Sequence, residues 1–483
     1  MYQWDKIEET SDLFPSKKIN LPEDSLLKKR ALNFDHHFHE QAPKHIQNFK
    51  KSKIEVYNHK TSLWNAFHDS GLSDILEQDC SIYPRVLPGS YLPVINKTAK
   101  DITELILKLI TLPESEVNAI FPHGPVRDFL LKELKVIKHR PDRLVGSLRF
   151  DMAIVGKPEV NNPPKLLEIN EIGFDGLARM PFIHDTLYSL MPELRKKYFS
   201  LDTSSAEIKN MKRLGNSLAR FQTDCYNWDE ELLLRRAKEK KYDLRLVTPA
   251  SYGLDVDVND YPFLTEEKIQ IKDRKIKVGN NWYPESYMVS FALTIQDYID
   301  SKNLYSKLVR EQVPHYGPFV TGLFASKSIL AILADPHIRR KYLGSSSRLQ
   351  NSILPAHMLA EGKEGALINP SDYVIKYVDG FGGEHVFMDD EMVKTIKKIP
   401  AKKMNEWVIQ KRVNLNTIDI DGFLTKPRKA ISDLGVFVQY DWSNGKFNHF
   451  EVGGFLSRAT NTSLKVNISS GGSQVGVMFT KKS

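Results

Sequence analysis

Four polar residues have the types and the spacing that phosphate chemistry needs. Arg149 and Asp151 are two residues apart, and so are Glu168 and Asn170. Alternate residues of a strand share one face, so the sequence predicts a β-hairpin that gathers these side chains. Two carboxylates and an amide oxygen suit Mg²⁺, and an arginine beside them suits a transferring phosphoryl group.

The segment between these two stretches and their apolar residues support a hairpin. Asn161–Pro164 has the composition of a turn, and Leu148, Phe150 and Met152 alternate with the polar positions. A solvated polar face is the competing interpretation, because antiparallel sheets often keep one face in water. The rest of the chain has to decide between the two.

A glycine-rich loop with a lysine before it is a second candidate feature. Gly380, Gly382 and Gly383 allow backbone N–H groups to approach phosphates closely, and Lys376 lies four residues before the first of them. In a P-loop the lysine follows the glycines and begins a helix, so this loop is of another kind. A plain hairpin turn is the alternative.

Two further segments suit a nucleotide. Lys327 lies in the first turn of a helix expected over 325–334, and the strand expected over 406–413 suits an adenine-binding hinge with Gln410 and Lys411 nearby. An ordinary buried strand is the alternative for the second segment. Asp433 and Arg458 either line the phosphate or substrate side or form solvated strand ends.

The predicted elements alternate between helix and strand, which indicates a mixed α/β fold. The expected divisions are an N-terminal, mostly helical or irregular region (1–120) and a Mg²⁺-binding hairpin region (121–200). An α/β region (201–320) and a lid with C-terminal core strands (321–483) follow. Helices are expected over 101–112, 124–138, 178–190, 207–226, 290–304 and 390–399, and strands over 243–248, 372–377, 384–387, 429–439 and 449–455.

Composition narrows the class of protein. The chain has 483 residues, 41% hydrophobic and 27% charged, with a net charge of +8 spread along its length. This suits a globular enzyme with anionic ligands, and it predicts neither nucleic-acid nor membrane partners. The two cysteines, Cys80 and Cys225, argue against a disulfide framework and a cysteine zinc site, so the cytoplasm is the expected compartment.

Together these motifs resemble those of glutathionylspermidine synthetase and its relatives, a circularly permuted branch of the ATP-grasp superfamily. The resemblance covers roughly residues 120–480 and depends on four short motifs in the permuted order, with the hairpin before the lid. It implies an ATP-grasp fold, with a mixed, largely antiparallel central sheet and a separate lid. It also implies that Asp151, Glu168 and Asn170 bind Mg²⁺ and that Arg149 stabilises the transferring phosphate. ATP would be held by Lys327, Lys376, Gly380, Gly382, Gly383, Gln410 and Lys411.

The chain departs from the family at two places. The residues after Asn170 do not continue toward Asp-Thr-Pro, and Phe381-Gly-Gly-Glu384 stands where the lid commonly has Arg-Glu-Gly. We therefore expect an ATP-dependent carboxylate–amine ligase that acts on small-molecule or peptide substrates through an acylphosphate. The alternatives are a small-molecule kinase on the same scaffold and a non-catalytic nucleotide-binding protein. The sequence does not indicate the acid, the amine or the oligomeric state.

Overall fold

The structure is a computed structural model. It describes residues 81, 84–121, 143–170, 176–190, 192, 194–221, 228–247, 269–278, 281–283, 286–288, 311, 313, 315–317, 326–345, 347, 349–380, 385–420, 428–460, 466 and 472–481.

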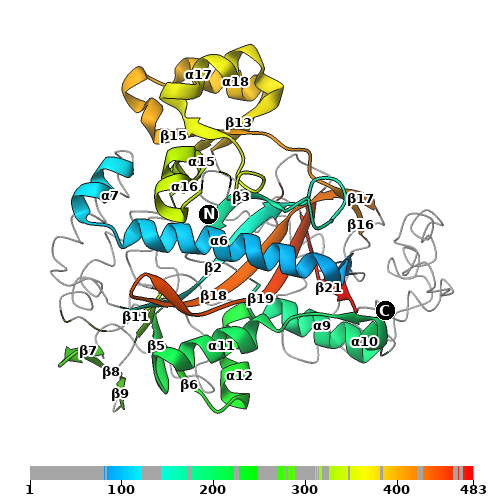
Figure 1. The fold of residues 1–483 in the computed structure, drawn as a ribbon. Helices are drawn as coiled ribbons and strands as arrows, with labels where there is room; N and C mark the ends of the chain where they lie inside the picture. Colours follow the sequence, from blue (N-terminus) through cyan, green and yellow to red (C-terminus); the bar gives the residue numbers. More distant parts are fainter. Residues whose placement is uncertain are drawn as a thin grey trace, which may run out of the picture.

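A mixed sheet forms the centre of the molecule (Figure 1). Its first half is antiparallel and leads to the long strand β2, whereas the second half runs parallel from β2 to β6. In spatial order the strands are β16 (Thr417–Ile420), β17 (Arg428–Ser432), β19 (Lys446–Thr460), β18 (Leu434–Ser443), β2 (Arg143–Ala153), β11 (His315–Tyr316), β10 (Ser286–Met288), β5 (Ser217–Phe221) and β6 (Asp243–Val247). The short strands β20 (Ser473–Val475) and β3 (Lys165–Asn170) pair with β19 and β2 respectively.

Helix α6 (Leu92–Ile110) covers one face of this sheet (Figure 1). Pro93 occupies its first turn, where a missing N–H costs nothing, and residues such as Ile95, Ile102 and Ile106 recur at helical spacing and are fully buried. They pack in one cluster with Leu148 and other apolar residues of the central strands. The apolar face of β2 therefore lies against α6.

The opposite face of β2 is covered by α11 (Thr203–Leu214). The helix begins at Asp202, whose carboxylate accepts a hydrogen bond from the Ser205 backbone N–H at 2.9 Å. Its Glu207 accepts a hydrogen bond from Ser147, which shares a face with Arg149. Further helices on this side are α9 (Arg179–Leu190), α10 (Leu194–Lys197) and α12 (Trp228–Glu239).

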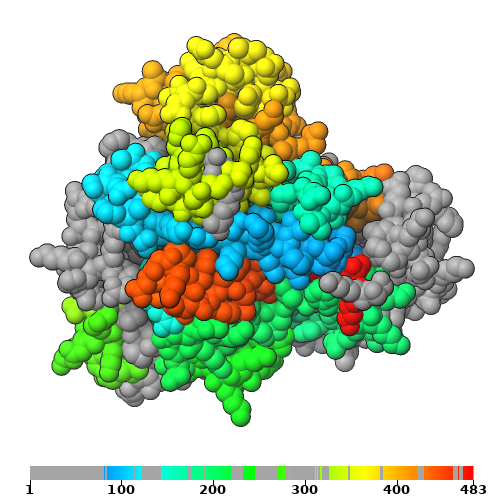
Figure 2. Space-filling view, in the orientation of Figure 1, coloured from blue at the N-terminus to red at the C-terminus, as the bar shows by residue number. Residues whose placement is uncertain are grey.

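The lid is a separate four-stranded antiparallel sheet in the order β12 (Ala356–Met358), β15 (Trp407–Lys411), β13 (Tyr373–Tyr377) and β14 (Val386–Met388). Helices α17 (Leu359–Ile368) and α18 (Asp389–Lys398) pack on one face of it and form a small core of their own. Figure 2 shows the lid, in yellow and orange, projecting above the blue surface of α6. Short helices η7 (Pro370–Asp372) and η8 (Ala401–Glu406) complete it.

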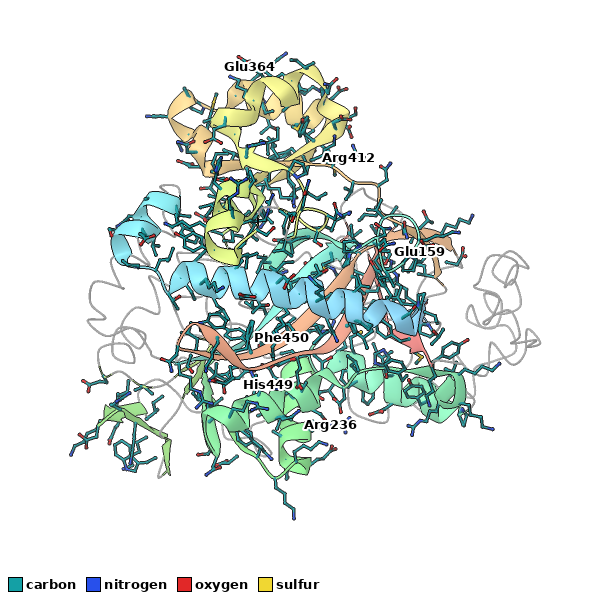
Figure 3. All side chains as sticks on the ribbon, viewed as in Figure 1. Glu159, Arg236, Glu364, Arg412, His449 and Phe450 are labelled. Atoms are coloured by element: carbon teal, nitrogen blue, oxygen red, sulfur yellow. The ribbon has the colours of Figure 1, made fainter. Side chains whose placement is uncertain are left out.

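Two helices connect the lid to the core. Helices α15 (Ser328–Ala334) and α16 (Pro336–Leu343) pack between the lid and α6. Within the lid, just after β15, Arg412 (labelled in Figure 3) donates from one nitrogen to both carboxylate oxygens of Asp389, at 2.9 and 3.0 Å. This ion pair holds the end of β15 against the start of α18.

Two small sheets lie beside the central one. The first joins the beginning and the end of the described chain, in the order β1 (Arg85–Leu87), β21 (Val477–Thr480) and β4 (Tyr198–Phe199). The second consists of β7 (Ile269–Lys272), β8 (Lys275–Val278) and β9 (Asn281–Tyr283). Helices η3 (Gly89–Tyr91) and α7 (Glu114–Ile120) flank α6 in sequence.

Most expected elements within the described residues are confirmed, and two are wrong in part. The strand expected over 429–439 is divided at Asp433 into β17 and β18. The helix expected over 207–226 ends at Leu214, before Gly215, and the alternating residues of β5 then pair with β6 and β10. The helices expected over 124–138 and 290–304 lie outside the described residues. The expected division into four ranges stays a prediction. No described helix has the length and apolar character needed to cross a membrane.

Candidate active site

The predicted hairpin forms, and its register gathers the four polar residues. Arg149 lies opposite Asn170, and Asp151 lies opposite Glu168, in the antiparallel pairing of β2 with β3. The face is not solvated, because Arg149 is 7% exposed and Asp151 only 3%. The competing interpretation of a plain solvated face is therefore wrong for these two residues.

Asp151 is the centre of a buried ion-pair cluster. Its carboxylate accepts hydrogen bonds from Arg149 Nε at 2.8 Å, from the Asn170 amide at 3.0 Å, and from Arg458 Nη2 at 2.8 Å. Burial alone would raise the pKa of this carboxyl, but Arg149 and Arg458 outweigh it and lower the pKa to about 2. Asp151 is therefore ionised at neutral pH and holds two guanidinium groups in place.

Arg458 extends the cluster across β19 to Asp433. Its Nε donates to Asp433 Oδ2 at 3.1 Å, Nη2 also bonds that oxygen, and the Arg458 backbone N–H donates to Oδ1 at 3.2 Å. Burial raises the pKa of the Asp433 carboxyl, whereas Asp151 and Asp433 together raise the pKa of Arg458 against its own burial. The sequence left the role of this pair open, and the structure places it beside Asp151.

Two lysines approach β3 from the lid side. Lys327, which precedes α15 as its N-cap, forms an ion pair with Glu168 at 2.8 Å and also donates to the Gly380 carbonyl. Lys376 of β13 donates to the Leu167 carbonyl at 2.9 Å. Burial lowers the pKa of Lys376 to about 8, with Glu168 opposing that shift. Burial would raise the pKa of Glu168, but Lys327 and Lys376 lower it.

A β-bulge explains why a backbone carbonyl is free to accept from Lys376. Asp151 lies opposite Glu168, but Met152 lies opposite Leu166, so Leu167 is an extra residue in β3. Its carbonyl points to Lys376, and the adjacent Leu166 carbonyl accepts from Gln410 Nε2 at 3.3 Å. The sequence predicted the hairpin without this bulge.

The hinge strand β15 differs from its expected position. We expected backbone groups at a strand edge to be available to adenine, but β15 lies between β12 and β13 and pairs with both. Gln410 is buried against β3, whereas Lys411 is exposed and its backbone N–H donates to Pro355 at 2.8 Å. Their contact with a nucleotide stays a prediction.

The glycine loop is described only at its beginning. Gly380 accepts from Lys327, whereas Gly382 and Gly383 lie outside the described residues. The preceding Asp379 was missed by the sequence analysis, because an aspartate before a glycine is ordinary turn composition. Both of its carboxylate oxygens are buried, and the side chain of Ser326 lies beside them. Burial raises the pKa of this carboxyl to about 6, and Lys327 opposes the shift.

These residues are of the types that ATP and Mg²⁺ need. Within the described ranges, no three His, Cys, Asp or Glu side chains form a ready metal cluster. Asp151 is already bonded by three donors, whereas the buried carboxylate of Asp379 interacts with Lys327, as Glu168 does. Glu168, Asn170 and Asp379 could therefore supply oxygen ligands to a hard cation, and the expected set of Asp151, Glu168 and Asn170 stays a prediction.

The sequence matches no known family model and no curated protein. Among solved structures, the chain is similar to the apo form of a glutathione synthetase-like effector from Globodera pallida, with a TM-score of 0.62 and 13% identity over 83% of this chain and 90% of that one. A putative γ-glutamylcysteine synthetase from Methylobacillus flagellatus matches at a TM-score of 0.37 and 8% identity, over 74% of this chain and 82% of that one. D-alanyl-alanine synthetase A from Vibrio cholerae matches at a TM-score of 0.28 and 10% identity, over 51% of this chain and 68% of that one. The chain has an ATP-grasp fold, as expected from the sequence.

Proposed function

We propose that this chain is an ATP-dependent carboxylate–amine ligase. The observation that carries the proposal is the meeting of the hairpin with the lid, where Lys327 pairs with Glu168 and Lys376 reaches the neighbouring carbonyl of β3. Residues of three separate segments thus form one site, to which Lys327 and Lys376 contribute two cationic side chains. Such a site suits the phosphates of a nucleotide.

Each residue has a role in this proposal. Lys327 and Lys376 hold the nucleotide phosphates, and Gln410 and Lys411 lie on the strand proposed to contact the adenine. Mg²⁺, held by Glu168, Asn170 and Asp379, would neutralise charge on those phosphates. The role expected for Asp151 changes, because its contacts make it the anchor of Arg149 and Arg458.

The proposed reaction has two steps. A substrate carboxylate oxygen attacks the γ-phosphorus, which breaks the bond to ADP and gives an acylphosphate. The amine nitrogen then attacks the acyl carbon, loses a proton, and expels inorganic phosphate as the amide forms. Arg149 neutralises the negative charge in both steps, since that charge develops at the same place. The lid excludes water, which would otherwise hydrolyse the acylphosphate.

The order of the motifs supports the permuted branch as the finer proposal. The hairpin at 149–170 precedes the lid lysines at 327 and 376 in the chain. A likeness to glutathionylspermidine synthetase further suggests an amino-acid or peptide-like substrate, and the compartment expected for it is the cytoplasm.

An ADP-release screen of carboxylates crossed with amines tests the proposal, with mass detection of the product. We expect ADP only when the correct acid and amine are both present, and a product mass equal to acid plus amine minus water. Stable phosphorylated product formed without an amine would identify a kinase instead. If no pair releases ADP and ATP·Mg²⁺ leaves the melting temperature unchanged, the chain is a non-catalytic protein.

A further inference from the structure

Arg85 is a buried cation at the first strand of the described fold. Its β1 backbone N–H donates to the Gly476 carbonyl at 2.8 Å, and Arg85 lies opposite Val477 in the parallel pairing with β21. The residue is 7% exposed. Burial lowers the pKa of its guanidinium to about 10, with Asp433 opposing the shift, so Arg85 remains protonated at neutral pH.

The guanidinium of Arg85 is aimed at the junction between β17 and β18. Its Nη1 donates to the Asp433 carbonyl at 2.8 Å, to Ser432 Oγ at 3.1 Å and to Ser457 Oγ at 3.2 Å. The two hydroxyls lie 2.7 Å apart, and Ser457 also donates to the Asp433 carbonyl at 2.7 Å. One nitrogen therefore fixes the backbone of Asp433.

Asp433 transmits this position to the site. Its backbone N–H donates to the Arg458 carbonyl at 3.2 Å, and its carboxylate accepts from both the backbone and the guanidinium of Arg458. The same guanidinium bonds Asp151 at 2.8 Å. A continuous path of hydrogen bonds thus leads from Arg85 through Asp433 and Arg458 to Asp151.

We infer that Arg85 is a positioning residue for the reaction, which holds Arg458 at Asp151 by fixing Asp433. The inference rests on the proposed function, because that proposal places Arg149 and Asp151 at the transferring phosphate. It gives β1, the first of the described strands and more than 50 residues before β2 in sequence, a part in the site.

If residue 85 served the fold alone, an apolar side chain would do so with a smaller desolvation penalty. A guanidinium buried against neutral acceptors carries a desolvation penalty, and buried ionic groups often stabilise a fold less than hydrophobic replacements do. Arg339 supplies a comparison, because it is equally buried and also bonds backbone carbonyls, those of Leu333 and Ala334, at 2.7 and 2.8 Å. These two partners belong to α15 and not to the path through Asp433, so Arg339 serves as the control.

The test combines stability with kinetics in the full chain. Arg85→Gln, Asp433→Asn and the double variant form a double-mutant cycle for the unfolding equilibrium constant in denaturant. We expect the double variant to differ from the product of the single effects by about tenfold or more. In steady-state assays we expect Arg85→Gln to lower kcat for ADP release at least tenfold with little change in the KM for ATP, and Arg85→Lys to recover part of the loss.

The controls separate the possible failures. Arg339→Gln should lose stability while its kcat stays within about twofold of wild type. If Arg85→Gln does not fold, Ser457→Ala removes one acceptor and should give the same direction of change in kcat. Additive single effects, or wild-type kinetics for Arg85→Gln, would overturn the inference. Should the wild-type chain release no ADP, the proposed function fails, and the double-mutant cycle alone decides whether Arg85 fixes Asp433.

Discussion

Glu168 and Lys327 show how one residue pair can serve the fold and the site at once. Lys327 is 3% exposed and Glu168 28% exposed, and their charged groups are 2.8 Å apart. A buried charge that loses its partner is expensive, even where the intact pair contributes little net stability. We therefore expect that substitutions here change stability and activity separately.

We predict that Glu168→Gln lowers ADP release by two or more orders of magnitude and also destabilises the fold by about 1–3 kcal/mol, because Lys327 stays buried without its partner. The double variant Glu168→Gln/Lys327→Met should recover much of that stability but none of the activity. Chemical denaturation and steady-state assays measure the two effects. Glu116→Gln, at an exposed pair with Lys341, is the control and should change neither. Near-normal ADP release by Glu168→Gln would contradict the assignment.

Residue spacing predicted the polar face of the hairpin but could not predict every contact in it. The alternation at Arg149 and Asp151 survives because β2 is regular over its whole length. The bulge at Leu167 lies where β3 meets Ser352 and Ile353, which is a tertiary contact. Asp379 was missed for a different reason, since only burial distinguishes its carboxylate from that of an ordinary turn aspartate.

At the scale of elements, pattern predicted strands and helices well where one face is buried. Strand β13 and helix α18 lie within a residue or two of their expected bounds. The prediction of helix after Gly215 was wrong. Ser217–Phe221 has residues that are compatible with a helix, but the pairing of this segment with β6 and β10 overrides that local preference. The short strand β1 could not be predicted from local pattern, because its partner β21 is almost 400 residues away in the sequence.

His184 links two elements and makes their packing sensitive to pH. On α9 it is 2% exposed, and its Nε2 accepts from the Val477 backbone N–H at 3.1 Å. Burial lowers the pKa of this imidazole from 6.5 to about 4. The unfolded chain therefore takes up a proton below pH 6.5 that the folded chain takes up only near pH 4.

We predict that the free energy of unfolding falls by about 2–3 kcal/mol between pH 6.5 and 4 on account of His184, and that this contribution levels off below pH 4. Denaturation curves at several pH values measure it. His184→Gln removes the titrating group, so the free energy of unfolding of this variant should fall by about 2–3 kcal/mol less than that of wild type over the same pH range. Parallel pH profiles for the two proteins would show that the imidazole is not held neutral.

At the scale of the whole molecule, the lid docks on the central sheet through the same groups that are proposed to hold the nucleotide. Lys376 and Gln410 bond successive carbonyls of β3, and Lys327 bonds both Glu168 and Gly380. In the ligand-free chain these contacts keep the lid near the sheet. A nucleotide in this interface would replace part of them, so its binding and the placement of the lid are linked.

We predict that ATP·Mg²⁺ raises the melting temperature of the wild-type chain progressively with concentration, because a ligand of the native state adds about 2.7 kcal/mol at one hundred times its dissociation constant. Lys376→Met should lose most of that shift, since the methionine fills the buried position but supplies no charge to a phosphate. Its own stability without ligand should stay close to wild type, because burial already disfavours the charged form of Lys376. Lys363→Met, on the outer helix α17, is the control and should keep the full shift. An equal shift in Lys376→Met and wild type would place the nucleotide elsewhere than between the lid and β3.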